Sequence, residues 1–243
     1  MSTPPPATTS RFNEEAASWD SNPFVQAATT MAHKTYLSRL PPPETLSQYN
    51  ILDLGCGTGL LTFLLAPSVR SVTAVDVSEG MIDVLNTKLN ALPPPHNVLG
   101  VHALLSDPDD PILSFDPVTG DSFPQRRFDL VVSHLVLHHI PSLPPVFANI
   151  FGLLKEGGRV MVTDFEDFGP EARRFHPESK MEGVERHGIK RDEIRRILEE
   201  AGFKDVKVET AFEMEKAVET TPGSGETGGD LMTFPFLVCE GTK

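Results

Sequence analysis

Short apolar runs alternate with amphipathic segments along most of the chain. The runs expected to form strands are residues 50–54, 71–75, 97–105, 128–133, 159–163, 206–212 and 233–239. The segments with apolar residues at helical spacing include residues 60–65, 78–92, 144–154 and 191–201. Strands that alternate with helices predict an α/β fold, in which helices cover both faces of a mostly parallel sheet.

The two ends of the chain depart from this alternation. Residues 1–10 are mostly Pro, Ser and Thr, so we expect a disordered tail there and a single domain over residues 11–243. Helical spacing predicts two helices within residues 11–43, the second stopped by three prolines. The last two strands are joined by a loop without a helix, which predicts an antiparallel hairpin.

An acidic composition narrows the range of partners. The chain has 34 acidic and 21 basic residues, which gives a formal net charge of −13. Such a charge repels nucleic acid and anionic membrane surfaces, so we expect neither as a partner. No apolar run approaches the ~18 residues of a membrane helix. The start of the chain lacks the basic and apolar regions of a secretory signal.

The two cysteines carry no sign of metal or disulfide chemistry. Cys56 and Cys239 have no cysteine or histidine partners at the spacing of a disulfide framework or a zinc site. We therefore expect no metal, and a reducing, cytoplasmic location. The sequence leaves the oligomeric state open.

The strongest local signal is a glycine loop that follows the first strand, Ile51-Leu-Asp-Leu-Gly-Cys-Gly-Thr-Gly59. Its glycines allow a sharp turn and a close approach of the backbone to a ligand. A dinucleotide loop would need another glycine at position 60, where this chain has Leu60. Asp53 would repel a pyrophosphate but attract a cationic ammonium or sulfonium group.

A second acidic residue, Asp76, ends the second strand. A carboxylate at this point can accept hydrogen bonds from both hydroxyls of an adenosine ribose. Enzymes that bind NAD also use a carboxylate to bind the ribose hydroxyls. Asp76 therefore indicates an adenosine-containing ligand but does not distinguish between cofactors.

Five segments in order along the chain resemble the motifs of class I S-adenosylmethionine-dependent methyltransferases. They are Asp53-Leu-Gly-Cys-Gly-Thr-Gly59, Val75-Asp-Val-Ser78, Phe128-Asp-Leu-Val-Val-Ser-His-Leu-Val-Leu-His-His139, Gly157-Gly-Arg-Val-Met-Val162 and Ile197-Leu-Glu-Glu-Ala-Gly-Phe203. The chain is similar in particular to the small-molecule group related to the ubiquinone and menaquinone C-methyltransferases. The resemblance implies a Rossmann-like, seven-stranded, mostly parallel sheet with a C-terminal antiparallel hairpin and helices on both faces.

The resemblance also implies S-adenosylmethionine as the cofactor, with residues 11–43 as an N-terminal helical lid. Asp53 and the glycine loop would hold the methionine portion, Asp76 the ribose, and Asp107 the adenine amino group. The full set of implied cofactor-binding residues is Trp19, Asp53, Gly55, Cys56, Gly57, Gly59, Asp76, Val77, Met81, Asp107, Ser133 and His134.

Methyl transfer from a sulfonium is an in-line SN2 displacement, so a base is needed only where the acceptor must lose a proton. His138, His139 and His187 are the candidate bases. The first two are adjacent and project about 100° apart on a helical turn, so at most one should face a pocket. Residues 165–176 lie where the family varies its acceptor pocket, and their phenylalanines would suit an apolar or heteroaromatic acceptor.

Three functions stay open at this stage, and a fourth, an NAD-dependent dehydrogenase, is disfavoured by Leu60 and Asp53. The first is a small-molecule methyltransferase acting on O, N, S or C. A protein or peptide methyltransferase on the same fold is the second, and it would need an open acidic cleft. The third is a non-catalytic partner subunit with the methyltransferase fold, although the intact Asp53, glycine loop and Asp76 argue against lost cofactor binding.

Overall fold

The computed structural model describes residues 6–94, 96–221, 223–224 and 230–243, and within them the predicted alternation is confirmed. The strands are β1 (Asn50–Leu54), β2 (Ser71–Asp76), β3 (Val98–His102), β4 (Phe128–His134), β5 (Leu154–Phe165), β6 (Lys204–Ala217) and β7 (Leu231–Thr242). The α-helices are α1 (Pro6–Trp19), α2 (Pro23–Leu37), α3 (Pro43–Leu46), α4 (Leu60–Leu65), α5 (Glu79–Asn90), α6 (Pro144–Leu153) and α7 (Arg191–Glu200). Among the described residues, no helix has the length and hydrophobicity needed to cross a membrane.

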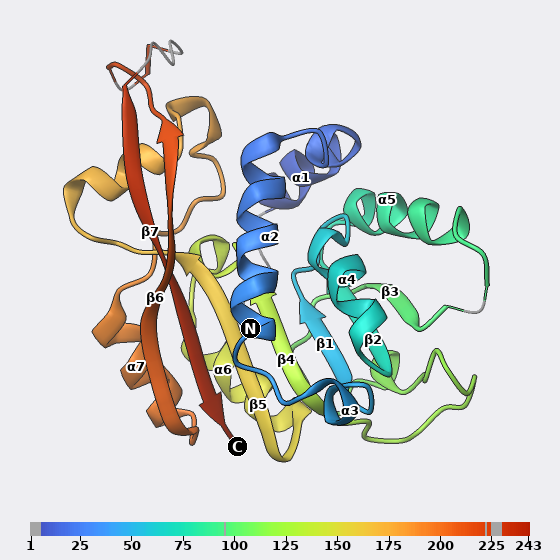
Figure 1. Ribbon diagram of the computed structural model, residues 1–243. Helices are drawn as coiled ribbons and strands as arrows, with labels where there is room; N and C mark the ends of the chain where they lie inside the picture. The colour runs from blue at the N-terminus through green and yellow to red at the C-terminus, as the bar shows by residue number, and fades with distance from the viewer. Residues whose placement is uncertain (1–5, 95, 222, 225–229) are drawn as a thin grey trace.

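The described strands form one seven-stranded sheet in the order β3-β2-β1-β4-β5-β7-β6. The first five run parallel, and β7 pairs antiparallel with both β5 and β6. Figure 1 shows β6 and β7 as a long twisted ribbon at one side of the molecule. The predicted Rossmann-like sheet and its C-terminal antiparallel hairpin are therefore confirmed.

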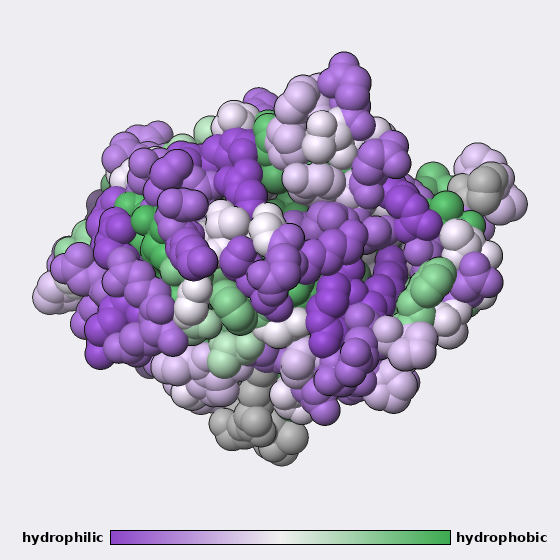
Figure 2. Space-filling view, turned by 90° about the horizontal axis from the view of Figure 1, so that it is seen from below, coloured by the Kyte–Doolittle hydropathy of each residue, from purple (hydrophilic) through white to green (hydrophobic). Residues whose placement is uncertain are grey.

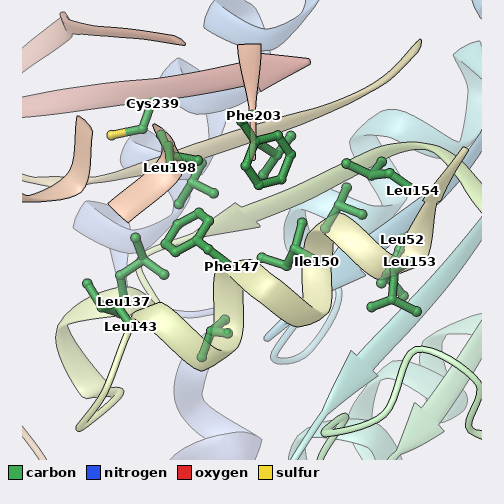
Figure 3. Packing of buried hydrophobic residues seen from close by; sticks show 14 of the residues in the cluster. Leu52, Leu137, Leu143, Phe147, Ile150, Leu153, Leu154, Leu198, Phe203 and Cys239 are labelled. Carbon is green, nitrogen blue, oxygen red and sulfur yellow. The ribbon is translucent and has the colours of Figure 1, made fainter. Parts of the chain in front are cut away.

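Both faces of the sheet are buried, because successive side chains of a strand point to opposite sides. Ile51 packs with α2, α4 and α5 on one face, whereas the next residue, Leu52, packs with α6 and α7 on the other. Figure 3 shows the second cluster, with Phe147 and Ile150 of α6 close to Leu198 of α7. Strands buried on both faces read as continuous apolar runs, which is the pattern of the central strands.

Some boundaries differ from the predictions. The described part of the expected tail, residues 6–10, is helical, because α1 begins at Pro6; residues 1–5 lie outside the described residues. Proline suits this first helical position, where its missing N–H costs no hydrogen bond. Strand β5 begins at Leu154 rather than residue 159, and its register with β4 shifts around Gly157, where φ is 74°.

The end of the molecule where α3 lies differs from the opposite end, at the carboxyl ends of the parallel strands. Viewed from the α3 end, the surface is mainly hydrophilic, with hydrophobic residues in smaller separate areas (Figure 2). At the opposite end, α1 lies beside α5, and α2 crosses in front of the central strands (Figure 1). A ligand of an open α/β sheet binds at the carboxyl ends of its strands, so this end is where the site is expected.

Candidate active site

A pocket lies at the carboxyl ends of β1, β2 and β4. Its wall includes the glycine loop, the ends of these strands, and the segment after β4. Helices α1 and α2 cover it, with Phe12 and Trp19 from the first helix and Val25 and Thr29 from the second. The pocket is therefore built from segments that come from widely separated parts of the chain.

The glycine loop is held by two backbone hydrogen bonds to β2. The N–H groups of Gly55 and Cys56 donate to the carbonyl oxygen of Val75, at 2.8 and 3.1 Å. Gly55 has φ of 73°, and a Cβ there would lie 2.4 Å from a methyl carbon of Val136. Gly59, also at positive φ, precedes α4. The loop needs glycine for its backbone conformation and, at position 55, for the close approach of the segment after β4.

Asp76 lies at the end of β2 and ties the loop to α5. One carboxylate oxygen accepts a hydrogen bond from the N–H of Gly57, and the other accepts one from the N–H of Ser78, each at 2.8 Å. Burial raises the pKa of Asp76, although these backbone N–H groups act in the opposite direction. Each oxygen has a second lone pair, so the side chain can accept further hydrogen bonds from a ligand.

Asp53, at the end of β1, is 1% exposed and lines the pocket. The hydroxyl of Thr62 on α4 donates to it at 2.6 Å. Burial raises the pKa of Asp53 to about 7. Among the described residues, Thr62 is the one hydrogen-bond donor to this buried carboxylate. A cationic ligand group beside it would stabilise its ionised form.

Helix α1 is fastened across the pocket by polar contacts from its middle and from the residue that follows its last turn. The side chain of Asn13 accepts hydrogen bonds from the hydroxyl of Ser78 at 2.7 Å and from the N–H of Gly80 at 2.9 Å. Asp20 accepts from the hydroxyl of Thr58 in the glycine loop and pairs with Lys88 of α5 at 2.7 Å. These bonds bring Trp19 to the pocket beside Phe12, with ring centroids 5.8 Å apart.

His134, the last residue of β4, lines the pocket next to the glycine loop. Its Nδ1 lies 2.8 Å from the hydroxyl of Thr163, and its Nε2 is buried with no hydrogen-bond partner among the described residues. Burial lowers the pKa of His134 to about 4, so the ring is neutral at physiological pH. Leu135 follows with φ of 58°, a strained conformation for a non-glycine residue at the pocket wall.

The adjacent histidines of the next turn, Leu137–His139, have different surroundings, although their ring centroids lie 3.9 Å apart. His139 lines the pocket, and its Nδ1 donates to the carbonyl oxygen of Gly183 at 2.8 Å. His138 is buried behind it, with Nδ1 at 2.9 and 3.0 Å from the two carboxylate oxygens of Asp164. Burial lowers the pKa of His139. Of these two rings, His139 therefore lines the pocket and His138 lies behind it.

Most of the predicted cofactor residues meet in this pocket. The described lining residues include Trp19, Asp53, Gly55, Cys56, Gly57, Asp76, Val77, Met81 and His134. Gly59 supports the loop from behind, where a Cβ would meet Leu85 at 2.9 Å. Ser133 is fully buried and donates from its hydroxyl to the carbonyl oxygen of Leu54, so it joins β4 to β1 instead of lining the pocket.

Other predicted residues lie elsewhere. Asp107 is exposed and accepts a hydrogen bond from the N–H of Asp109, because β3 ends at His102 and the chain has turned away by residue 107. His187 is not among the described lining residues. Phe165 and Phe175 stack on each other at 3.9 Å in a buried aromatic cluster, so they do not form an acceptor wall.

One pocket residue that the sequence did not single out is Asn149. It lies on α6, where its side-chain N–H donates to the carbonyl oxygen of Leu105 at 3.0 Å. Its Oδ1 is buried and has no partner among the described residues. The available signal was a polar residue on an otherwise apolar helix, since a buried polar atom without a partner is costly unless a ligand or water satisfies it.

The chain is similar to several proteins that are named as methyltransferases. An uncharacterized methyltransferase of Schizosaccharomyces pombe is 33% identical over 144 residues, which cover 58% of this chain and 48% of that protein. A ubiquinone biosynthesis O-methyltransferase of Coxiella burnetii is 27% identical over 150 residues, which cover 62% of this chain and 58% of that protein. The chain thus matches about half the length of these curated relatives.

A solved structure with the same fold is the N-methyltransferase NodS from Bradyrhizobium japonicum, determined in complex with S-adenosyl-L-homocysteine. It superimposes with a TM-score of 0.59 at 17% identity, covering 98% of each chain. A methyltransferase domain profile matches residues 26–208, which is more than half of the sequence. The chain therefore belongs to the methyltransferase domain family.

Proposed function

We propose that this methyltransferase transfers a methyl group from S-adenosylmethionine to a small-molecule acceptor by in-line displacement. The observation that carries the proposal is that Asp53, Asp76 and the glycine loop line one pocket. The buried carboxylate of Asp53 suits the cationic methionine end of the cofactor, and Asp76 suits the ribose hydroxyls.

The other pocket residues fit the rest of such a cofactor. Val77 and Met81 offer apolar surface for a purine next to Asp76. The unpartnered Oδ1 of Asn149 is an acceptor that an exocyclic amino group could satisfy. Asp107 has no part in this arrangement, because its side chain caps a turn outside the pocket.

The two helices that cover the pocket, α1 and α2, favour a small acceptor over a protein tail. Phe12, Trp19, Val25 and Thr29 bring mostly apolar side chains over its mouth from α1 and α2. A basic peptide would require an open acidic cleft, whereas a pocket wall of mostly apolar side chains favours a compact ligand.

The bound cofactor supplies the methyl group and its own leaving group. The chain's residues orient the reactants and exclude water, and Trp19 and Phe12 serve the second purpose. Of the candidate bases, His139 lines the pocket. The Nδ1–H of His139 donates to the carbonyl oxygen of Gly183, so its Nε2 carries a lone pair. This lone pair can take a proton from the methyl acceptor or bind a metal ion, but not both.

The first test is calorimetric titration of the purified chain with S-adenosylmethionine, S-adenosylhomocysteine and NAD. We expect both sulfur compounds to bind and NAD to be rejected. Incorporation of labelled methyl groups into cell extract, before and after macromolecules are removed, then tests the acceptor class. Binding of NAD alone would overturn the cofactor assignment, and activity that vanishes with the macromolecules would overturn the small-molecule assignment.

A further inference from the structure

Three histidines from two separate segments of the chain converge beside the pocket. His138 and His139 form the end of the turn after β4, and His176 follows the 3-10 helix Pro170–Phe175. One ring nitrogen of each lies within 4.8 Å of those of the other two. The ring centroids of His138 and His139 are 3.9 Å apart, and those of His138 and His176 are 5.1 Å apart.

Two of the three rings are oriented as metal-ligating histidines are. The Nδ1 of His139 faces the carbonyl oxygen of Gly183, which only accepts hydrogen bonds, so this nitrogen carries the proton and Nε2 carries a lone pair. The Nδ1 of His138 faces both carboxylate oxygens of Asp164, which gives the same tautomer. A carboxylate or carbonyl behind Nδ1 is the usual partner of a histidine that binds metal through Nε2.

Asp164 is itself held in place. It lies at the buried end of β5, fully inaccessible, and accepts hydrogen bonds from the N–H groups of His138 and Phe165 at 3.1 and 2.9 Å. Among the described residues, no hydrogen bond joins the Nε2 atom of His138 or of His139 to another group. The lone pairs of these two atoms are therefore left for a ligand.

The distances suit a first-row transition metal after a small adjustment. Zinc–nitrogen bonds are about 2.0–2.1 Å, which places tetrahedral ligand nitrogens about 3.4 Å apart. The ring nitrogens, which lie within 4.8 Å of one another, therefore need to approach by at most about 1.4 Å. His176 lies in a connection after a short helix and contacts Phe165 and Phe175 through ring edges, so it is the ring that can shift.

From this arrangement we infer that His138, His139 and His176 form a binding site for a divalent transition metal such as Zn²⁺, with a fourth coordination position open toward the pocket. Three imidazoles with an open fourth position are a catalytic type of zinc site, and imidazole also suits Cu²⁺, Ni²⁺ and Fe²⁺. His139 lines the pocket, so the open position adjoins the space for the acceptor.

The charges around the cluster indicate which fourth ligand the metal takes. Arg11 and Lys216 act on His176 as positive charges, and Arg11 also acts on His139. Asp164 is the negative charge behind the cluster. Nearby cations favour an anionic fourth ligand over a neutral one. If the proposed methyl transfer holds, that ligand is an ionised hydroxyl or thiol of the acceptor, whose pKa the metal lowers.

Metal binding is tested without any methyl transfer. The untagged chain, stripped with a chelator, is titrated with Co²⁺ while its visible absorption is followed, and with Zn²⁺ by calorimetry. We expect saturation at one ion per chain, with the intense absorption of four-coordinate cobalt. Absence of saturable binding of either ion would overturn the site.

Three variants locate the ion. His176→Gln should weaken Co²⁺ affinity at least about 100-fold, and Asp164→Asn, which removes the charge behind His138, about 10- to 100-fold. His33→Gln on α2, outside the cluster, is the matched control and should bind as the parent does. Equal affinity of the parent and His176→Gln, with both folded by thermal unfolding, would refute the assignment.

S-adenosylhomocysteine binding, measured on the same samples, separates the two proposals. A chain that binds the nucleoside but no Co²⁺ contradicts only the metal site. A chain that binds Co²⁺ but no nucleoside supports the metal site and contradicts the proposed function.

Discussion

The two sides of the pocket are built from contacts of very different range. On the glycine-loop side, Asp53 bonds to Thr62 nine residues away, and Asp76 bonds to Gly57 nineteen residues away. On the histidine side, His139 bonds to Gly183 at a separation of 44 residues, and Arg11 bonds to the carbonyl oxygen of Lys180 at 169. The first side can form within one continuous stretch of the chain from β1 to the end of β2, whereas the second needs three distant segments to come together.

The difference in contact range indicates which side of the pocket can change its residues more readily. The glycine-loop side offers carboxylates and backbone groups for a constant ligand. The histidine side is assembled by the connections after β4 and β5, and loops tolerate change more readily than the elements they join. We therefore expect changes on the first side to affect cofactor binding, and changes on the second to affect turnover.

The largest expected effect is on the histidine side. For an acceptor that must lose a proton, His139→Gln should lower kcat about 10²- to 10⁴-fold, because it removes the Nε2 that accepts the proton or binds the metal. S-adenosylhomocysteine affinity should stay within about twofold. His187→Gln, outside the described pocket wall, is the comparison and should keep most of the activity. Equal losses in the two variants would contradict the separation that the structure makes.

A change in the glycine loop should act through stability. In Gly55→Ala the new Cβ would lie 2.4 Å from Val136 at a φ of 73°. Crowding and the left-handed conformation should together reduce the free energy of unfolding by about 2–5 kcal/mol. Gly120→Ala shares the positive φ but meets nothing within 4 Å, so its cost should be about 1–2 kcal/mol. Chemical denaturation of both variants measures the difference.

Asp76 and Asp107 give a smaller contrast in cofactor binding. Asp76→Ala should weaken S-adenosylmethionine binding by about 1–3 kcal/mol, because charged hydrogen bonds to the ribose are lost. Asp107→Ala should leave the affinity unchanged, since this exposed side chain caps a turn. Calorimetry measures the S-adenosylmethionine affinity of both variants. A loss of affinity confined to Asp107→Ala would reverse our assignment of the adenosine contacts.

The smallest effect is a pH dependence. Because burial raises the pKa of Asp53 to about 7, the carboxyl is mostly protonated below about pH 6 and mostly ionised above about pH 8. Only the ionised form attracts the cofactor ammonium, so affinity should rise by about tenfold across this range. In Asp53→Asn most of the rise should disappear. Affinity that falls with rising pH in the parent chain would contradict the role of Asp53.

The fold was predictable because its signals are local. The alternation of apolar runs and amphipathic segments is visible in the sequence, and both faces of the sheet are buried as that pattern requires. The lengths of β6 and β7 were not predictable, since their outer halves pack on an aromatic cluster that includes Phe165 and Phe175. That cluster forms only when α2, the hairpin and residues 165–175 meet.

The positions of Asp107 and Asn149 in the site were also not predictable from local sequence patterns. Asp107 was expected in the pocket from its place after the third strand, but β3 ends five residues earlier and the chain turns outward. Asn149 takes a place on the pocket wall from a helix that reads as plain core. Once a loop follows a strand, the number of residues from the strand end does not determine whether a side chain points into the pocket.

Local patterns in the sequence specify the layered α/β sheet, the glycine loop, and the two acidic strand ends, because hydrogen bonds and side-chain periodicity within about twenty residues produce them. The sequence also predicts that at most one of His138 and His139 faces a pocket. Tertiary contacts place His139 at the pocket, bring His176 to both rings, and lay α1 across the site. These arrangements depend on contacts between distant segments, from the 44 residues between His139 and Gly183 to the 169 between Arg11 and Lys180, and no local pattern encodes them.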